Sequence, residues 1–216
     1  MSRPKLIIFD LDGTLVNAYP AIIESFNYTL KKLGYPPQDS LSIRRAVGWG
    51  DENLLKPFIK SKDLSKALKI YRRHHRLSLL KKAYLFGGVK NLLKDLKKKN
   101  FKIAIASNRP TVFTKLIIKN LNIKEYIDYV SCADKLKYIK PHPQILYKIM
   151  KKFSLKPDEV LYVGDMVIDV EAGRRANIKT VALTTGSDTK EKLVLKKPFR
   201  IISKIIQLKD ILRELT

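Results

Sequence analysis

The stretch that decides the fold is KLIIFDLDGT, residues 5–14. Its apolar run Leu6–Phe9 predicts a buried β-strand, because a near-continuous apolar run suits a parallel sheet that is covered on both faces. In open α/β sheets ligands bind at the carboxyl ends of the strands, and Asp10 and Asp12 stand at that end. Residues two apart in an extended chain point the same way, so we expect both carboxylates to face one site, with Gly13 letting the backbone turn.

Two neighbouring carboxylates repel each other, so such a pair either shares a proton or holds a cation. The alternative interpretation is that Asp10-Leu-Asp12-Gly13 is a turn with polar caps, which is a common use of these residue types. The motifs found further along the chain favour the chemical interpretation.

Length and composition describe an ordinary globular protein. The 216 residues suffice for one domain, or for one domain that carries an insertion, and 45% of them are hydrophobic. No apolar run approaches the roughly 20 residues of a membrane span. A strand begins almost at once, without the apolar region of a signal peptide, so we expect a cytoplasmic protein. Cys132 is the single cysteine, which excludes an internal disulfide, and its apolar surroundings favour a buried small side chain over a nucleophile.

The charge is strongly positive. Lys and Arg number 44 against 20 Asp and Glu, which gives +24 and a pI near 10.0. Such a potential attracts phosphate-bearing molecules, nucleic acid included. However, the lysines are scattered over helical segments such as 94–99 and 148–152, and no aromatic residues alternate with them as in a stacking platform. We therefore favour solvated helix faces and expect no nucleic-acid partner.

The hydrophobic pattern predicts helices first and an α/β alternation afterwards. Helical spacing runs through Ala21–Leu33, Ser40–Ala46, Asp51–Ile59 and Asp63–Leu80, and no strand is predicted before Phe101, so residues 16–84 read as an all-helical insertion. Strands are then predicted at Lys102–Ser107, Tyr129–Ser131, Val160–Val163, Thr180–Leu183 and, as an edge strand, Phe199–Ile202. Helices are predicted at Val89–Lys99, Thr111–Leu121, Gln144–Phe153, Val170–Ala176 and Ile205–Leu215. This alternation predicts an α/β fold with a doubly wound, Rossmann-like parallel sheet.

Polar side chains follow several of the predicted strands. Ser107 and Asn108 end the second strand, Asp165 and Asp169 follow the fourth, and Lys140 precedes a helix stiffened by prolines. The carboxyl ends of parallel strands lie on one rim, so we expect these groups to meet Asp10 and Asp12. The carboxylates are the hard oxygen ligands that Mg²⁺ prefers. The serine, the asparagine and the lysine offer donors and positive charge to a phosphate.

With these motifs in order, the sequence resembles the haloacid dehalogenase superfamily of phosphohydrolases. Asp10-Leu-Asp12-Gly-Thr14 matches its first motif, Ser107 the second, Lys140 the third and Gly164-Asp165-xxx-Asp169 the fourth. The resemblance covers essentially the whole chain. It implies a core domain of residues 1–15 and 85–216 and a helical C1-type cap domain of residues 16–84, as in the phosphoglycolate phosphatase-like branch.

The resemblance also implies catalytic roles. Asp10 is expected to be the nucleophile that accepts the phosphoryl group, and Asp12 the acid that protonates the leaving oxygen and then activates water. A carboxylate that attacks a phosphate ester meets an anion, so a cation and a lysine are needed to neutralise the charge. The dehalogenases of the superfamily lack an acid at position 12, so its presence favours phosphoryl transfer over carbon–halogen cleavage.

The implied cofactor is Mg²⁺, held by Asp10, the backbone carbonyl of Asp12 and Asp165, with Asp169 in support. The implied phosphate-binding residues are Ser107 and Lys140, with Thr14 and Asn108 beside them. Within the cap, the segment 44–50 resembles one that dips toward the substrate in that branch. Arg45 and Trp49 are its candidate contacts, against the alternatives that Arg45 is solvated and that Trp49 packs in the cap.

The function implied is a Mg²⁺-dependent phosphatase for a small phosphomonoester, with phosphoglycolate as the first guess. The expected partner is a small phosphorylated metabolite, with no membrane partner, and the chain a monomer or homodimer. The alternatives are a β-phosphoglucomutase-like phosphotransferase, a pyrophosphatase or nucleotidase, and a non-catalytic binding protein with a basic surface. We expect the cap to close over the substrate, with hinges near residues 15–18 and 84–87.

Three further features of the sequence give little information about function. Asn17 stands where many relatives carry an acid. The run Arg72–Arg76 could bind a metal or an anion, but adjacent histidines on a helix point about 100° apart and chelate poorly, so we interpret it as a polar face of the cap. His142 is interpreted as loop polarity.

Overall fold

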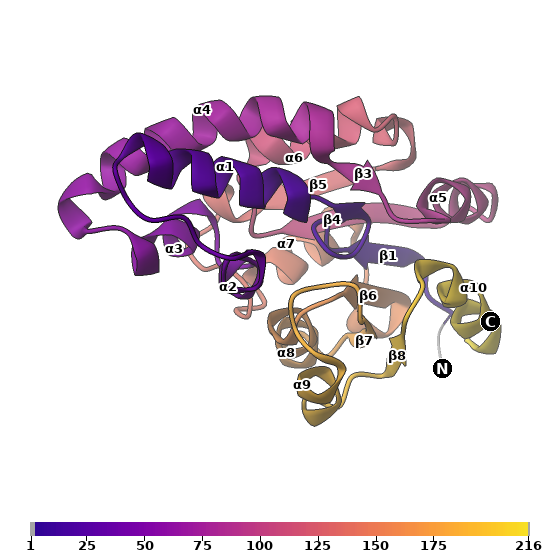
Figure 1. Cartoon of the computed structure of the whole chain (residues 1–216). Helices are drawn as coiled ribbons and strands as arrows, with labels where there is room; N and C mark the ends of the chain where they lie inside the picture. The colour runs from indigo at the N-terminus through magenta and orange to yellow at the C-terminus, as the bar shows by residue number, and fades with distance from the viewer. Residues whose placement is uncertain (1–2, 216) are drawn as a thin grey trace.

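A six-stranded, all-parallel sheet forms the centre of the molecule in the computed structural model, which describes residues 3–215 (Figure 1). The strand order is β5-β4-β1-β6-β7-β8. The strands are β1 (Leu6–Phe9), β4 (Lys102–Ser107), β5 (Tyr129–Cys132), β6 (Val160–Gly164), β7 (Lys179–Leu183) and β8 (Arg200–Ile202). The chain winds outward from β1 on one side through β4 and β5, and then returns to the other side of β1 at β6. This reversal of direction beside β1 is the position at which doubly wound sheets bind ligands.

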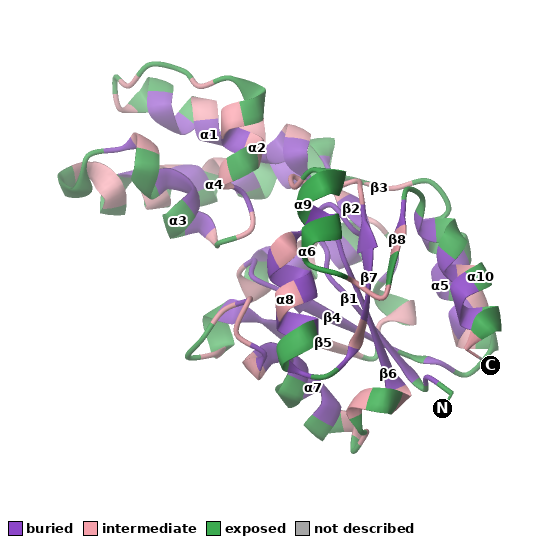
Figure 2. Cartoon of the chain, turned by 90° about the horizontal axis from the view of Figure 1, so that it is seen from below, coloured by how far each residue is buried: buried purple, intermediate pink, exposed green. Residues whose placement is uncertain are grey.

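Alternation along each strand sends side chains to two separate hydrophobic layers. Ile7 and Phe9 of β1 face the layer that is covered by α5 (Val89–Lys98), α6 (Thr111–Asn120) and α10 (Leu208–Glu214). Leu6 and Ile8 face the layer covered by α7 (Gln144–Phe153) and α8 (Val167–Arg175). All four residues of β1 are fully buried, which explains its unbroken apolar sequence (Figure 2).

Four helices between β1 and β4 form a lobe beside the sheet (Figures 1 and 2). They are α1 (Tyr19–Lys32), α2 (Ser40–Ala46), α3 (Asp51–Leu55) and α4 (Leu64–Lys82). The long helices α1 and α4 pack against each other, and Asp39 caps α2 by accepting hydrogen bonds from the backbone of Leu41 and Ser42. The division into a cap of residues 16–84 and a core remains our proposal.

Two short strands connect this lobe to the sheet and correct the prediction that the insertion is all helical. β2 (Val16–Asn17) pairs antiparallel with β3 (Tyr84–Leu85). The side chain of Asn17 donates a hydrogen bond to the Tyr84 hydroxyl at 2.7 Å, so it joins the two connections. A two-residue strand has no alternation to detect, which is why the hydrophobic pattern gave no sign of either strand.

The other differences concern the ends of helices and strands and one helix that was missed. Helix α8 begins at Val167, three residues before its predicted start, and α9 (Lys190–Leu195) was not predicted. The predicted last helix is a 3₁₀ turn followed by α10. The 3₁₀ turns lie at Lys56–Phe58, Ser61–Asp63, Lys124–Tyr126, Ala133–Lys135, Pro157–Glu159 and Ile205–Gln207. Within the described residues, none of the helices combines the length and apolarity of a membrane span. Cys132 is buried, as predicted.

Candidate active site

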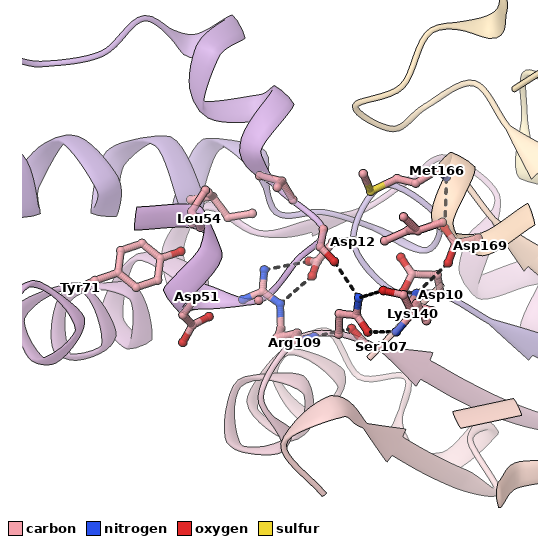
Figure 3. Close-up of a pocket in the computed structure, with 16 residues that line it drawn as sticks. Asp10, Asp12, Asp51, Leu54, Tyr71, Ser107, Arg109, Lys140, Met166 and Asp169 are labelled. Atoms are coloured by element: carbon pink, nitrogen blue, oxygen red, sulfur yellow. Dashed lines mark hydrogen bonds and ion pairs between the residues drawn. The ribbon is translucent and has the colours of Figure 1, made fainter. Parts of the chain in front are cut away.

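The carboxyl ends of β1, β4 and β6 bring the polar motifs to one rim of the sheet. Phe9 is in register with Ile105 of β4 and with Val163 of β6, so the three strands end side by side. The backbone N–H of Asp10 still donates to the Val163 carbonyl at 2.8 Å, which fixes Asp10 at the last pairing of the sheet. The acids after β1 and β6 therefore meet, and Asp10 and Asp169 both contact Lys140 (Figure 3). Thr14 and Asp165, which are 151 residues apart in the chain, form a hydrogen bond beside them.

Lys140 lies at the centre of the site and is almost completely buried. Its Nζ donates to Asp10 Oδ1 at 2.6 Å and to Asp169 Oδ1 at 2.7 Å, and further contacts join it to the Ala106 carbonyl and the Tyr162 hydroxyl. Burial opposes the charge of this ammonium group, but the two carboxylates outweigh that effect and raise the pKa of Lys140 well above its usual value. Lys140 therefore stays positive beside the candidate nucleophile.

Asp169 supports the site from the first turn of α8. Its Oδ1 accepts from Lys140 and from the Tyr162 hydroxyl, the latter at 2.5 Å. Its Oδ2 accepts from the backbone N–H groups of Asp165 and Met166 at 3.2 and 3.1 Å. Both oxygens of Asp169 thus serve to orient neighbouring groups, which fits a supporting position.

The residues present fit a divalent cation. Carboxylate oxygens of Asp10, Asp165 and Asp169 lie within 4.8 Å of one another. Asp165 is fully buried; Thr14 donates to its Oδ1 at 2.6 Å, whereas its Oδ2 has no hydrogen-bond partner among residues 3–215. A buried carboxylate oxygen without a partner is costly, and a cation among three hard oxygen ligands would satisfy it.

Glycine makes room around the same carboxylate. A Cβ atom on Gly13 would lie 2.2 Å from Asp165 Oδ2, and one on Gly186 would lie 1.9 Å from it. Real Cβ atoms never come so close to another heavy atom, so both backbone segments can approach Asp165 only as glycine. Gly13 also has φ of +86°, in the region that favours glycine.

Asp10 and Asp165 resist ionisation when no cation is present. Burial, together with the neighbouring Asp169, raises the pKa of Asp10 to about 7, although Lys140 acts in the opposite direction. Burial and the charges of Asp10 and Asp169 also raise the pKa of Asp165 well above its usual value. A cation would favour the ionised forms of both groups.

Ser107 and Asn108 occupy different environments after β4. Ser107 is buried, lines the cavity above Asp10, and accepts a hydrogen bond from the Arg109 backbone at 3.1 Å. The Asn108 side chain donates to the carbonyls of Gly48 and Lys140 and accepts from the Lys140 backbone. Asn108 therefore joins the loop of Lys140 to the helical lobe, in addition to lining the cavity.

Arg109 is a site residue that the sequence analysis missed. Its Nε donates to Asp12 Oδ2 at 2.6 Å and its Nη2 donates to Asp12 Oδ1 at 3.0 Å, so the guanidinium holds both oxygens of the candidate general acid (Figure 3). Nη1 lies 2.7 Å from His75 Nε2 in helix α4. The available signal was a cation directly after the Ser107-Asn108 pair, but only the tertiary structure shows which acid it meets.

His75 corrects the interpretation of the run Arg72–Arg76 as a polar cap face. His75 is fully buried, its ring stacks on Tyr71, and its Nδ1 lies 3.2 Å from the hydroxyl of Ser25 in α1. The run lies on α4, where one helical turn points His75 at the sheet while its exposed neighbours Arg73 and Arg76 point to solvent. The interpretation as a solvent-exposed polar face is correct for Arg73 and Arg76 and wrong for His75.

The segment 44–50 closes the site from above. Arg44 donates to the Gly186 carbonyl at 3.3 Å and lies over the Tyr19 ring, whereas Arg45 and Trp49 are exposed and do not line the cavity. Gly48 and Gly50 do line it. His142 lies outside it, in its own loop, where its Nδ1 accepts from the Gln144 backbone.

A small cavity of about 50 Å³ remains between the lobe and the strand ends. Its floor is polar, with Asp10, Ser107 and Lys140 at the strand ends. Its other end is apolar and belongs to the lobe, with Ile22, Val47, Leu54 and Tyr71. This arrangement suits a phosphoryl group on the polar floor and a small leaving group toward the lobe.

Known proteins share this sequence pattern and this fold. A phosphoglycolate phosphatase of Pasteurella multocida is 32% identical over 227 residues, covering 98% of this chain and 100% of the relative. One of Aquifex aeolicus is 31% identical over 182 residues, covering 84% and 85%. The crystal structure of a predicted phosphoglycolate phosphatase from Haemophilus somnus superposes with a TM-score of 0.93 at 27% identity, over 98% of this chain and 99% of that one.

The sequence model of the haloacid dehalogenase-like hydrolases matches residues 7–183, which include all the motifs at the strand ends. That match spans most of the chain. The buried acids, the central lysine and the parallel sheet are thus accounted for together: this protein belongs to the haloacid dehalogenase-like hydrolase family.

Proposed function

We propose that this hydrolase is a Mg²⁺-dependent phosphatase that cleaves a small, phosphoglycolate-like phosphomonoester through an aspartyl-phosphate intermediate. The observation that carries the proposal is the buried constellation of Asp10, Lys140 and the unpartnered oxygen of Asp165. Its relatives named phosphoglycolate phosphatase support the substrate class, and the small cavity supports a short leaving group.

In this mechanism an oxygen of Asp10 attacks phosphorus and the bond from phosphorus to the ester oxygen breaks. Asp12 donates a proton to the departing oxygen, and later takes a proton from the water that hydrolyses the phosphoaspartate. Lys140, fixed between Asp10 and Asp169, offsets charge on the attacking carboxylate and on the phosphoryl oxygens. Ser107 donates a hydrogen bond from its hydroxyl to one of those oxygens.

Mg²⁺ would be held by Asp10, the backbone carbonyl of Asp12 and Asp165, with Asp169 in support, and when bound it would supply positive charge for the phosphoryl oxygens. Thr14 contributes by orienting Asp165, to which it donates a hydrogen bond. Asn108 contributes by tying Lys140 to the lobe. Arg45 stays a candidate for contacts that form at the mouth of the site.

We further propose that the helical lobe acts as a cap, that the protein acts on a metabolite in the cytoplasm as a monomer or homodimer, and that nucleic acid is not a partner. The contacts from Gly48 to Asn108 and from His75 to Arg109 join lobe and core directly over the site. Such contacts exclude bulk water from the reacting groups.

The decisive experiment measures phosphate release from small phosphomonoesters, sugar phosphates, nucleotides and pyrophosphate, with Mg²⁺ and with EDTA, for the wild type and for Asp10→Asn. We expect release that needs both Mg²⁺ and Asp10, fastest with a short phosphomonoester. Release that survives in Asp10→Asn would refute the nucleophile. Transfer of the phosphoryl group to a sugar, rather than its release, would favour the phosphotransferase alternative.

A further inference from the structure

The candidate general acid is fully occupied by another side chain. Both oxygens of Asp12 accept hydrogen bonds from Arg109, at 2.6 and 3.0 Å. This is the paired geometry in which a guanidinium binds a carboxylate most strongly. Both oxygens of Asp12 are directed at the guanidinium, so turning toward an ester oxygen to act as its acid requires this pair to open.

Arg109 is held in place independently of Asp12. Its Nη1 contacts His75 Nε2 at 2.7 Å, and His75 is fixed in turn by Ser25 and by stacking on Tyr71. Burial lowers the pKa of His75 well below 6.5, so the neutral ring can accept a hydrogen bond from the guanidinium. If the Asp12 carboxylate moves away, Arg109 therefore keeps its position and presents its freed N–H groups to the cavity.

The charges around the cavity make Arg109 the available cation at the leaving-group end. Among the described lining residues two carry positive charge, Lys140 and Arg109. Lys140 is engaged with Asp10 and Asp169 at the polar floor. Asp51 also lines the cavity, but its carboxylate pairs with Arg72 at 3.0 Å, so its charge is balanced from outside.

We propose that Arg109 determines specificity by binding a carboxylate of the substrate on the carbon next to the ester oxygen, and that Asp12 holds this place until the substrate displaces it. The inference rests on the proposed phosphatase function, for which it names the recognised group. The position follows from geometry: Arg109 contacts the very carboxylate that has to reach the ester oxygen, so an anion bound to Arg109 lies near that oxygen. The cavity is small, about 50 Å³, which favours a short acid over a longer one.

The exchange links recognition to catalysis. A substrate carboxylate replaces the Asp12 carboxylate on the guanidinium. The freed Asp12 takes a proton from solvent and then gives it to the ester oxygen of the same substrate. An ester whose leaving group has no carboxylate cannot replace Asp12 on Arg109. Asp12 then stays paired with Arg109 and does not reach the ester oxygen. Selectivity then arises in turnover as well as in binding.

The first test compares 2-phosphoglycolate with ethyl phosphate, which has the same length but no carboxylate, in the wild type, Arg109→Gln and Arg109→Lys. We expect kcat/KM of the wild type to favour phosphoglycolate at least about 30-fold, and this preference to fall to within about threefold in Arg109→Gln. Arg109→Lys should keep an intermediate preference, because it retains the charge and loses the fork. An equal loss of activity toward both esters in Arg109→Gln would overturn the inference and leave Arg109 as a support for Asp12.

The second test measures glycolate binding by calorimetry, with glycolamide as the uncharged control, and needs no turnover. Because Asp12 competes for Arg109, Asp12→Asn should bind glycolate about tenfold more tightly than the wild type does. The gain should vanish in the double variant Asp12→Asn/Arg109→Gln, which separates competition for Arg109 from the general effect of removing a negative charge. Unchanged or weaker binding to Asp12→Asn, or a gain that persists in the double variant, would overturn the inference.

The two proposals fail in different ways. Release of p-nitrophenolate from p-nitrophenyl phosphate by the wild type, measured as a single-turnover burst, reports on phosphoryl transfer to Asp10 alone, because this leaving group needs no proton. If this ester is hydrolysed and the preference for phosphoglycolate does not depend on Arg109, the specificity inference is wrong and the phosphatase stands. If the wild type hydrolyses none of the three esters with Mg²⁺ present, the proposed function is wrong.

Discussion

Neighbouring residues on one helix have opposite environments in this protein. His74 stacks on Tyr28 with 4.0 Å between ring centroids and is partly exposed, whereas His75 is buried against Arg109. The 100° step between successive helical residues is sufficient to separate them. Burial disfavours the protonated form of His75. An imidazolium has N–H groups on both ring nitrogens, so it can no longer accept the hydrogen bond from Arg109, and its positive charge is repelled by the guanidinium.

This environment predicts a pH dependence of stability. Burial and Arg109 lower the pKa of His75 below the 6.5 of the unfolded chain, while His74 adds a smaller effect in the same direction. As the pH falls below about 6.5, the unfolded chain binds a proton at His75 that the folded protein refuses, so the contribution of His75 to stability falls by up to about 1.4 kcal/mol per pH unit until its folded pKa is reached. The raised pKa values of Asp10 and Asp165 act in the opposite direction, so the effect of His75 is the difference in slope between the wild type and a variant that lacks it. We expect His75→Gln, whose amide oxygen can accept from Arg109, to flatten this slope.

Denaturant unfolding at pH 7, 6 and 5 measures the effect. His142→Gln is the matched control, because His142 lies in a loop away from Arg109 and its replacement should leave the slope unchanged. A His75→Gln variant that loses stability toward pH 5 as steeply as the wild type does would contradict the assignment.

The second prediction at this scale concerns the buried lysine. Lys140→Met leaves Asp10 and Asp169 facing each other without their cation, so we expect the free energy of unfolding in EDTA to fall by about 3–5 kcal/mol. The exposed Lys148→Met on α7 should change it by less than about 0.5 kcal/mol. Adding Asp169→Asn to Lys140→Met should recover part of the loss, and no recovery would argue against charge as the cause.

Among the elements, the paired connections β2 and β3 decide how the lobe is attached. The chain enters the lobe at Val16 and leaves it at Leu85, and these residues are paired across the two strands. The Asn17 side chain also accepts from the Tyr19 backbone at 3.2 Å, so it links the strand to the start of α1. Asn17 therefore has a structural role at the position where many relatives carry an acid.

The segment between α2 and α3 yields an element-scale prediction. Gly48 has φ of +113°, its carbonyl accepts from Asn108, and a Cβ atom here would lie 2.6 Å from Met166 Sδ. We expect Gly48→Ala to displace this segment from the core and to lower kcat/KM by about tenfold or more. Gly34→Ala is the control, because Gly34 also has positive φ, +74°, but no atom within 4 Å of an added Cβ.

Both variants should lose about 1–2 kcal/mol of stability from the backbone conformation. They should differ in steady-state kinetics, because Gly48 alone contacts the site. Equal kcat/KM values for the two variants would show that the position of this segment does not limit the reaction.

For the whole molecule, the contacts between lobe and core predict that turnover requires the lobe to open and close. In the double variant Gly48→Cys/Met166→Cys, oxidation should join the lobe to the core, because a Cβ atom added to Gly48 would lie 2.6 Å from Met166 Sδ. We expect phosphate release to stop in the oxidised protein and to return to the level of the reduced variant after dithiothreitol. The single-cysteine variants control for oxidation elsewhere, and full activity of the cross-linked form would refute the requirement for opening.

The net charge of +24 does not arise from the site. Both cations that line the cavity are paired there, Lys140 with Asp10 and Asp169, and Arg109 with Asp12. The excess positive charge therefore lies on the rest of the surface, in keeping with the solvated helix faces expected from the scattered lysines.

The sequence was sufficient to predict most strands of the sheet and the acids at the strand ends. It was not sufficient where contacts join segments that are far apart in the chain. The strand Leu6–Phe9 and the helices Ser40–Ala46 and Gln144–Phe153 were predicted with their observed bounds. The two-residue strands β2 and β3 were missed, because their pairing joins segments that are nearly 70 residues apart in the chain, as the Asn17–Tyr84 contact shows. Local pattern contains no information about such a pairing.

The sequence by itself determined the parallel sheet and the meeting of Asp10, Lys140 and Asp165, because alternation and burial place strand ends on one rim whatever the details of packing. Only the tertiary structure decided that Arg109 holds Asp12 and that His75 holds Arg109. These contacts join three segments through side-chain directions, which depend on how the lobe packs on the sheet. A one-dimensional pattern cannot encode that orientation, and it is this orientation that selects the group the site can recognise.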